Sequence, residues 1–96
     1  MAFTHIVMFT WNRDDVDEAG IAEALRTLVA RFDGVQSYLC GPDAGVSPDA
    51  GDFAIVATFD DRESFAAYRD HPDHRRIVSE LIMPNAQSRN VVQLEY

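Results

Sequence analysis

Apolar and polar residues follow a regular pattern along this chain that predicts four β-strands. Residues 3–11 (FTHIVMFTW) are rich in β-branched and aromatic side chains, which is typical of a strand with apolar residues on both faces. Residues 35–40 (VQSYLC), 53–59 (FAIVATF) and 90–95 (NVVQLE) predict the other three strands. A loop rich in Gly and Pro, residues 41–52, separates the second strand from the third.

A long amphipathic helix is expected between the first two strands. Asp15 and Glu18 have the spacing of a capping box, in which two side chains satisfy free backbone N–H groups at the start of a helix. Apolar residues then recur at helical spacing from Ile21 to Phe32, and Gly34 ends the segment. One face of this helix should therefore pack on the sheet.

Two further helices are expected between the third and fourth strands. Asp60 or Asp61 can cap the first of them. The dipeptide His71-Pro72 should end this helix and begin the next, because proline disfavours the α conformation in the residue before it and suits the first turn of a helix. The last helix should then continue to Pro84.

The order of these elements is strand, helix, strand, strand, helix pair, strand. It predicts an α+β fold, namely a ferredoxin-like four-stranded antiparallel sheet with helices on one face. The 96 residues leave room for one domain, covering 1–96. Val and Ile occur on both faces of the strands, so the uncovered face is too apolar to remain in water. We therefore expect it to pair with a second copy of the chain as a homodimer.

Composition and charge restrict the partners. Sixteen acidic residues against eight basic ones give a net charge of −8 and a pI near 4.5, which disfavours nucleic acid and anionic membranes. No apolar run is long enough for a membrane span, and no basic segment followed by an apolar one marks a signal peptide. Cys40 is the single cysteine, which excludes an internal disulfide. We expect a cytoplasmic protein with neither nucleic acid nor membrane as a partner.

Four side chains capable of proton transfer or carbonyl polarisation fall on or near the helix-covered face: His5, Tyr68, His71 and His74. An imidazole with an ordinary pKa of about 6.5 takes up and returns protons at neutral pH, and a Tyr hydroxyl can polarise a carbonyl oxygen. Such a set suits proton abstraction next to a carbonyl group. The alternative is structural, with a strand His bonded to backbone, a packed Tyr and a His71 that caps a helix.

His74 is the strongest candidate, because it precedes apolar residues at helical spacing and an imidazole on such a stripe needs a polar partner or a polar cavity. With His71, apolar residues on the same side would form the substrate-binding set: Val7, Phe9, Phe65, Ile77, Val78 and Leu81. His71 and His74 lack a third ligand for a metal, and no phosphate-binding glycine motif occurs. We therefore expect neither a metal nor another cofactor.

The whole chain resembles the stress-responsive A/B barrel (Dabb) family. The segments that carry the resemblance are His5-Ile6-Val7 with Phe9, Gly41-x-Asp43, Phe53-Ala54-Ile55-Val56 with Thr58-Phe59, and Tyr68-x-x-His71-Pro72-x-His74. The resemblance implies a Dabb domain over residues 1–96, whose sheet pairs with that of a second subunit in a dimeric α+β barrel. It also implies a ligand cavity between sheet and helices in each subunit.

A plant polyketide cyclase of this family closes a linear poly-β-ketone without metal or organic cofactor. The resemblance places its general base on His74, its substrate-orienting tyrosine on Tyr68 and a further pocket histidine on His5. Ala54 stands where that cyclase has another pocket histidine, so its particular substrate does not transfer to this chain.

These observations give one leading hypothesis and two alternatives. The leading one is a homodimer that binds a small apolar or polyketide-like ligand and uses His74 as general base in a cofactor-free cyclisation or isomerisation. The first alternative is a stress-related ligand-binding module without catalysis. The second is a cofactor-independent monooxygenase, as the wider barrel superfamily suggests.

Overall fold

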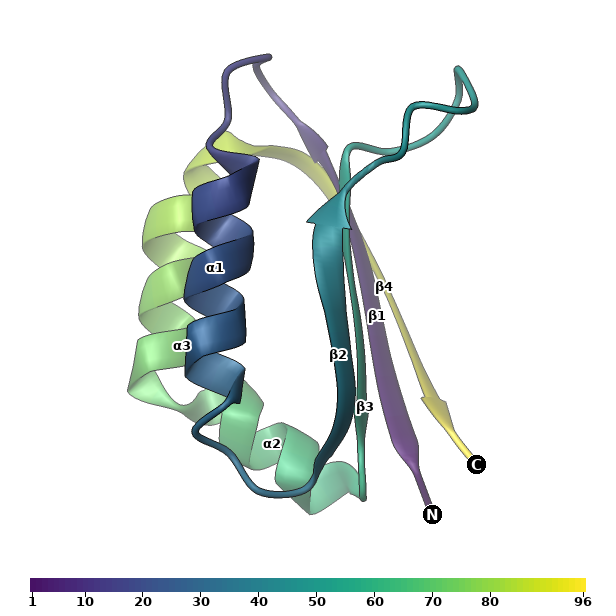
Figure 1. The fold of residues 1–96 in the computed structure, drawn as a ribbon, viewed down its shortest axis with the longest axis vertical. Coiled ribbons are helices and arrows are strands. Elements are labelled where there is room, and N and C mark those ends of the chain that lie inside the picture. The colour runs from purple at the N-terminus through teal and green to yellow at the C-terminus, as the bar shows by residue number, and fades with distance from the viewer.

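The computed structural model describes residues 1–96. Its elements in chain order are β1 (Phe3–Trp11), α1 (Glu18–Val29), β2 (Val35–Pro42), β3 (Phe53–Phe59), α2 (Arg62–Asp70), α3 (Pro72–Ile77), a π-helical turn η1 (Val78–Ile82), a 3₁₀ turn η2 (Met83–Asn85) and β4 (Ala86–Glu95). The strands form one antiparallel sheet in the order β2-β3-β1-β4, and all helices lie on one side of it (Figure 1). The predicted ferredoxin-like α+β fold is confirmed.

The register of the sheet decides which residues face the helices. Val7 in β1 lies opposite Ile55 of β3 and Val91 of β4, and residues directly opposite each other share a face. Val7 and Ile55 are buried beneath the helices, so Val91 belongs to the same face. The buried apolar residues form one cluster of 16 between sheet and helices, with Leu25 of α1 and Phe59 of β3 fully buried.

Of the two helix caps predicted from the sequence, that of α2 is confirmed and that of α1 is wrong. The Asp61 carboxylate accepts the N–H of Ser64 at 2.8 Å and caps α2, as predicted. The cap of α1 is Asp17, which accepts the N–H of Gly20 at 3.0 Å. The predicted capping box from Asp15 is therefore wrong, because the helix begins later and the Asp15 carboxylate instead lies 3.2 Å from Arg13.

The last helix also departs from the prediction of a continuous α-helix up to Pro84. The α-helical part ends at Ile77, and the N–H of Met83 bonds to the carbonyl of Val78, five residues earlier. A π-turn takes more residues than an α-turn, so it shifts the phase of the side chains that follow. Ile82 is only 1% exposed, whereas Leu81, predicted on the same buried stripe, is 40% exposed.

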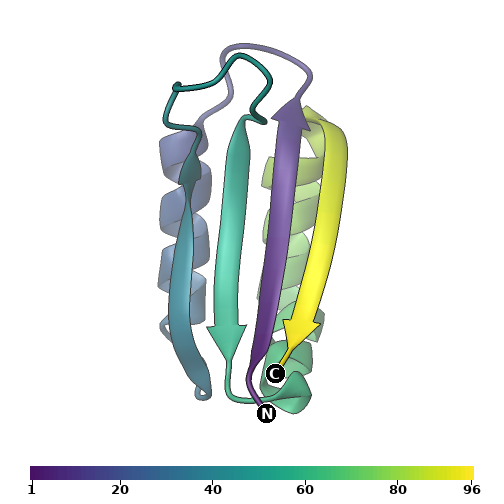
Figure 2. The same cartoon turned by 90° about the vertical axis from the view of Figure 1, so that its right-hand side faces the viewer.

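The face of the sheet away from the helices is open and apolar (Figure 2). Met8, Leu39, Val92 and Leu94 are its large exposed apolar side chains. Alternation along each strand puts them opposite the core-facing residues. The sequence prediction of two apolar faces is thus confirmed. None of the helices has the length and apolar character that crossing a bilayer requires.

The π-turn yields a paired prediction for two neighbouring residues. Ile82→Ala should lower the free energy of unfolding by about 3 kcal/mol, because it leaves a cavity in the core. Leu81→Ala should lower it by less than about 1 kcal/mol, because its side chain is largely in water. Urea unfolding of both variants measures the difference, and equal losses would show that both residues lie on one buried α-helical stripe.

Candidate functional site

The structure brings three of the predicted residues together on the helix-covered side of the sheet. They are His5 on β1, Tyr68 on α2 and His74 on α3. The ring centroids of Tyr68 and His74 lie 4.3 Å apart. The His5 ring lies 4.9 Å from that of Phe65, one turn before Tyr68, and a charge on His74 is among the influences that lower the pKa of His5.

His74 has a defined tautomer. Its Nδ1 lies 3.0 Å from the backbone carbonyl oxygen of Arg69, and a carbonyl oxygen only accepts hydrogen bonds. In the neutral ring Nδ1 therefore carries the hydrogen, and Nε2 keeps a lone pair that can accept a proton. Burial lowers the pKa of His74 below its ordinary value, although the Arg69 carbonyl acts in the opposite direction. The imidazole is thus held neutral, in the form of a base.

His5 has the complementary tautomer. The amide nitrogen of Gln93 lies 3.1 Å from Nδ1 of His5, and with the amide in this orientation its N–H donates to that atom. The hydrogen of the neutral His5 ring is then on Nε2, which becomes a donor. Burial, followed by the charges of Arg89 and His74, lowers the pKa of His5 to about 4. The two histidines together therefore offer one acceptor and one donor.

Tyr68 is 1% exposed and sits at the centre of an aromatic cluster. Phe32, Tyr38, Phe59 and His74 surround its ring at centroid distances between 4.3 and 5.9 Å. Its hydroxyl lies 2.7 Å from that of Tyr38 on β2. Burial raises the pKa of Tyr68 to about 12 and that of Tyr38 further, so both phenols stay protonated.

Tyr38 was not among the residues predicted from sequence. The sequence does indicate that Tyr38 is buried. It lies two residues from Cys40 in β2, so the side chains of both residues point to the helix-covered face. That pattern indicates burial but not the partner, because Tyr38 and Tyr68 are 30 residues apart in the chain.

His71 has a structural role in addition to any contact with a ligand. Its Nδ1 accepts the backbone N–H of Asp73 at 3.1 Å and caps α3. Its ring packs edge-on against Phe32, with centroids 5.3 Å apart. The structural alternative predicted from the sequence, in which His71 caps a helix, is therefore confirmed for Nδ1.

The predicted apolar lining divides into three groups. Val7, Phe9 and Phe65 are buried core residues, Ile77 and Val78 are half-buried against the core, and Leu81 is exposed. Phe9 stacks on Trp11 with ring centroids 5.6 Å apart, toward the far end of β1 from His5.

The flank along β4 is open. Arg89, Val91 and Gln93 lie opposite Phe9, Val7 and His5 and so share the helix-covered face, yet all three β4 residues are exposed. The helices therefore cover most of the core-facing residues of β1 and β3, with His5 only partly buried, and leave β4 accessible. Neither Arg89 nor Gln93 was predicted as a site residue, because their neighbours depend on the sheet register.

A surface hollow of about 470 Å³ lies beside His5, between α2 and β4. Phe65 and Gln93, which both contact the His5 ring, line it together with Arg62, Arg69 and Glu95. None of the five main hollows, of about 240 to 470 Å³, is lined by His5, Tyr68 or His74 themselves. No hollow of this size is therefore lined by the three residues in the single chain, and the expected ligand cavity around them is not among the five.

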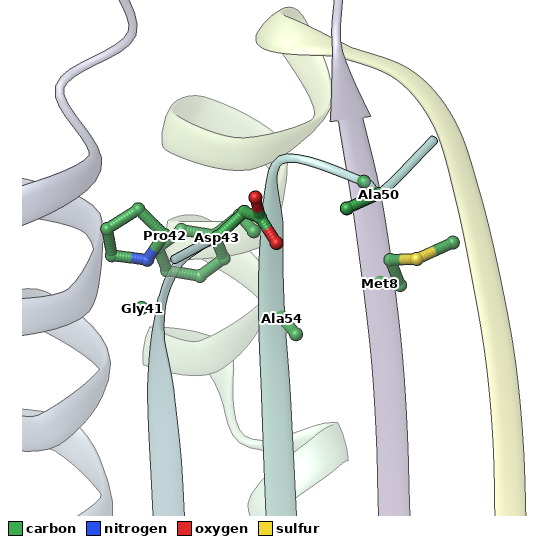
Figure 3. Close-up of a pocket in the computed structure, with 8 residues that line it drawn as sticks. Met8, Gly41, Pro42, Asp43, Ala50 and Ala54 are labelled. Atoms are coloured by element: carbon green, nitrogen blue, oxygen red, sulfur yellow. The ribbon is translucent and has the colours of Figure 1, made fainter. Parts of the chain in front are cut away.

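Another hollow lies on the uncovered face, away from the histidines (Figure 3). It holds about 260 Å³ between Met8 and Ala54 on neighbouring strands and the loop that follows Pro42. Asp43 is its one charged lining residue. It contains neither a histidine nor a tyrosine.

The lowered pKa of His5 predicts a specific pH dependence of stability. The unfolded chain takes up this proton near the ordinary pKa of 6.5, before the folded chain does at about 4. The contribution of His5 is therefore complete above pH 6.5 and is lost as pH falls toward 4. We expect a loss of about 1 kcal/mol, because water partly screens the half-exposed ring. Urea unfolding across this range should show a shallower decline for His5→Gln, and parallel curves would contradict the prediction.

Comparison with known proteins places the chain in a family. Residues 3–96 match the family described as the stress responsive A/B barrel domain. Over 81 residues the chain is 33% identical to the stress-response A/B barrel domain-containing protein DABB1 of Arabidopsis thaliana. The match covers 79% of this chain and only 39% of that relative.

Solved structures share the fold. A dimeric ferredoxin-like protein of unknown function from Thermobifida fusca has a TM-score of 0.87 and 36% identity, covering 100% of this chain and 92% of the other. A hydroxynitrile lyase from Passiflora edulis has a TM-score of 0.77 at 17% identity, covering 97% of this chain and 91% of the lyase. The cofactor-independent oxygenase SnoaB from Streptomyces nogalater has a TM-score of 0.74 at 11% identity, covering 99% and 92%.

The two enzymes catalyse different reactions on this fold, and at their low identities the likeness shows the fold alone. The match over residues 3–96 and the identity to DABB1 go further. They show that the chain belongs to the stress-responsive A/B barrel (Dabb) family.

Proposed function

We propose that this chain binds a small, largely apolar carbonyl compound on the β4 side of His5 and His74, and that His74 transfers a proton to and from it. The observation that carries this proposal is the hydrogen bond between Nδ1 of His74 and the Arg69 carbonyl. It fixes the ring with Nε2 as a base, while the contact with Tyr68 limits its rotation. Tyr68 acts as a positioning residue, because its hydroxyl is engaged by Tyr38.

The chemistry follows from the two tautomers. Nε2 of His74 takes the proton from a carbon next to the carbonyl group, and the electron pair of the C–H bond moves to the carbonyl oxygen as an enolate. Nε2–H of His5 donates to that oxygen. The enolate carbon then attacks a second carbonyl of the same molecule, whose oxygen takes the proton from Nε2 of His74, or the enolate takes that proton back at another atom. These steps are a cyclisation and an isomerisation, respectively, and neither calls for a cofactor.

The strength of such a base restricts the substrate. A positioned general base contributes about 10²- to 10⁴-fold in rate, which suffices for an acidic CH₂ group between two carbonyls but not for an unactivated C–H bond. We therefore infer a β-dicarbonyl compound or a longer polyketone as the substrate class.

The uncovered face supports a homodimer. Leu39, Val92 and Leu94 are 69%, 55% and 48% exposed on one side of the sheet, where pairing with a second sheet would remove them from water. The related protein from Thermobifida fusca is described as dimeric. Two copies packed through these faces would leave the β4 flank beside the histidines on the opposite side of each sheet.

The role of His74 predicts a loss of proton exchange in His74→Ala. The wild-type protein should accelerate deuterium uptake from D₂O at the acidic CH₂ of a β-keto ester, and the variant should reduce the enzymatic rate between about 10²- and 10⁴-fold. Mass spectrometry measures the uptake, after a thermal-shift screen has selected the β-keto esters that stabilise the protein.

Arg75→Ala is the matched control, because Arg75 is the next residue of α3 and is exposed. It should leave the exchange rate unchanged. Equal rates in wild type and His74→Ala would contradict the role of His74. A ligand that stabilises the wild type without any exchange or product would favour a binding module over an enzyme. Oxygen consumption with an aromatic ligand would favour a monooxygenase instead.

If two copies pair through the uncovered face, a charge placed on that face should disrupt the dimer. Val92→Glu should convert the protein to a monomer, because a carboxylate buried between two sheets lacks a partner. Val46→Glu adds the same charge at a loop residue that is 85% exposed and should have no effect. Sedimentation velocity distinguishes the two masses, and a monomeric wild type or a dimeric Val92→Glu variant would contradict the pairing.

A further inference from the structure

His71 lies at the break between α2 and α3 and holds the first turn of α3. Its Nδ1 accepts the backbone N–H of Asp73 at 3.1 Å, and its carbonyl oxygen accepts the N–H of Arg75 at 3.0 Å. Both bonds belong to the turn whose third residue is His74. The direction from which the His74 ring reaches the Arg69 carbonyl therefore depends on a turn that His71 closes.

The cap depends on the protonation state of the His71 ring. In the neutral ring Nδ1 keeps a lone pair that accepts the N–H of Asp73, whereas in the imidazolium both ring nitrogens carry hydrogen and neither accepts. The Asp73 carboxylate offers a protonated ring another partner, because its Oδ2 lies 4.0 Å from Nδ1. Protonation therefore replaces a bond to the backbone of α3 by an attraction to a side chain.

The charged and titratable residues around this ring come from three elements: Arg31 beyond α1, Arg69 and Asp70 on α2, and Asp73, His74 and Arg76 on α3. The Asp73 carboxylate is shared, since Arg31 and Arg76 each lie 2.8 Å from one of its oxygens. After burial, a charge on His71 is among the influences that lower the pKa of His74. A proton on His71 thus acts on both Asp73 and His74.

We infer that His71 is a positioning residue for His74: its neutral Nδ1 holds the first turn of α3 so that His74 meets the Arg69 carbonyl, and protonation of His71 in acid releases that contact. This inference rests on the proposed function, because it gives His71 a role only through the base His74. A His74 ring that leaves the carbonyl is free to carry its hydrogen on Nε2. In that tautomer Nε2 has no lone pair with which to take a proton.

Two substitutions separate the cap from the packing of the ring. His71→Asn keeps an N-cap acceptor that does not titrate, whereas His71→Phe keeps an aromatic ring against Phe32 and has no acceptor. NMR shifts of the ring nitrogens distinguish the two neutral tautomers, and the chain has three histidines to assign. At about pH 8, above the ordinary titration range of an imidazole, His74 should keep its hydrogen on Nδ1 in wild type and His71→Asn and populate both tautomers in His71→Phe.

Deuterium exchange of the β-keto ester gives a second readout, its dependence on pH. At about pH 8 the rate should fall about fivefold in His71→Phe, the factor that corresponds to one N-cap hydrogen bond, and should match wild type in His71→Asn. As pH falls, the rate of wild type should decline before that of His71→Asn, because the Asn cap survives acid. Charge repulsion alone predicts the opposite order, since removing the His71 charge lets His74 protonate at a higher pH.

An Nδ1 tautomer of His74 that survives in His71→Phe would overturn the role of the cap, and one lost in His71→Asn would show that ring packing holds the helix instead. A rate that declines at the same or a higher pH in His71→Asn than in wild type would overturn the effect of protonation, and this profile decides the case alone if His71→Phe does not fold. Absence of exchange in wild type would overturn the proposed function, while the tautomer comparison still decides the role of His71.

Discussion

The contact between Tyr68 and His74 depends on the interruption of the helix at His71-Pro72. His71 leaves the α conformation, with ψ near 136°, and α3 starts again from Pro72. A helix end leaves its last carbonyls without partners, and the carbonyl of Arg69 is one of these at the end of α2. The restarted helix brings Nδ1 of His74 to it at 3.0 Å. The break at this proline thus provides both the acceptor that fixes the His74 tautomer and the helix direction that brings its ring against Tyr68, at an interplanar angle of 52°.

The sheet also serves two purposes, one on each face. Each strand of so short a chain has apolar residues on two faces, and alternation separates their roles. Val7 is 2% exposed beneath the helices, whereas Met8, the next residue, is 39% exposed on the other face. The core is therefore complete on one side within the single chain. Packing a second sheet on the other side adds burial without altering the helix-covered face, so pairing and ligand binding can coexist.

Much of the fold could be predicted from sequence because it follows from local chemistry. The strands over 3–11 and 53–59 and the break at His71-Pro72 reflect alternation and proline geometry, which act over a few residues. The π-turn could not be predicted. Its hydrogen bond spans five residues in place of four, and the apolar residues of the sequence there have the ordinary spacing of an α-helix. Tyr38 and Gln93 were missed for another reason. Their partners are set by packing between elements and by strand register, on which a linear pattern carries no information.

The assignment of chemistry therefore depends on a few side chains and not on the fold. Related folds carry a hydroxynitrile lyase and a cofactor-independent oxygenase, so the sheet and helices serve as a scaffold for different reactions. In this chain burial lowers the pKa of both His5 and His74, while Arg69 and Gln93 assign them opposite tautomers. Nε2 of His74 can therefore accept a proton and Nε2–H of His5 can donate a hydrogen bond, which are the two roles that the proposed reaction requires.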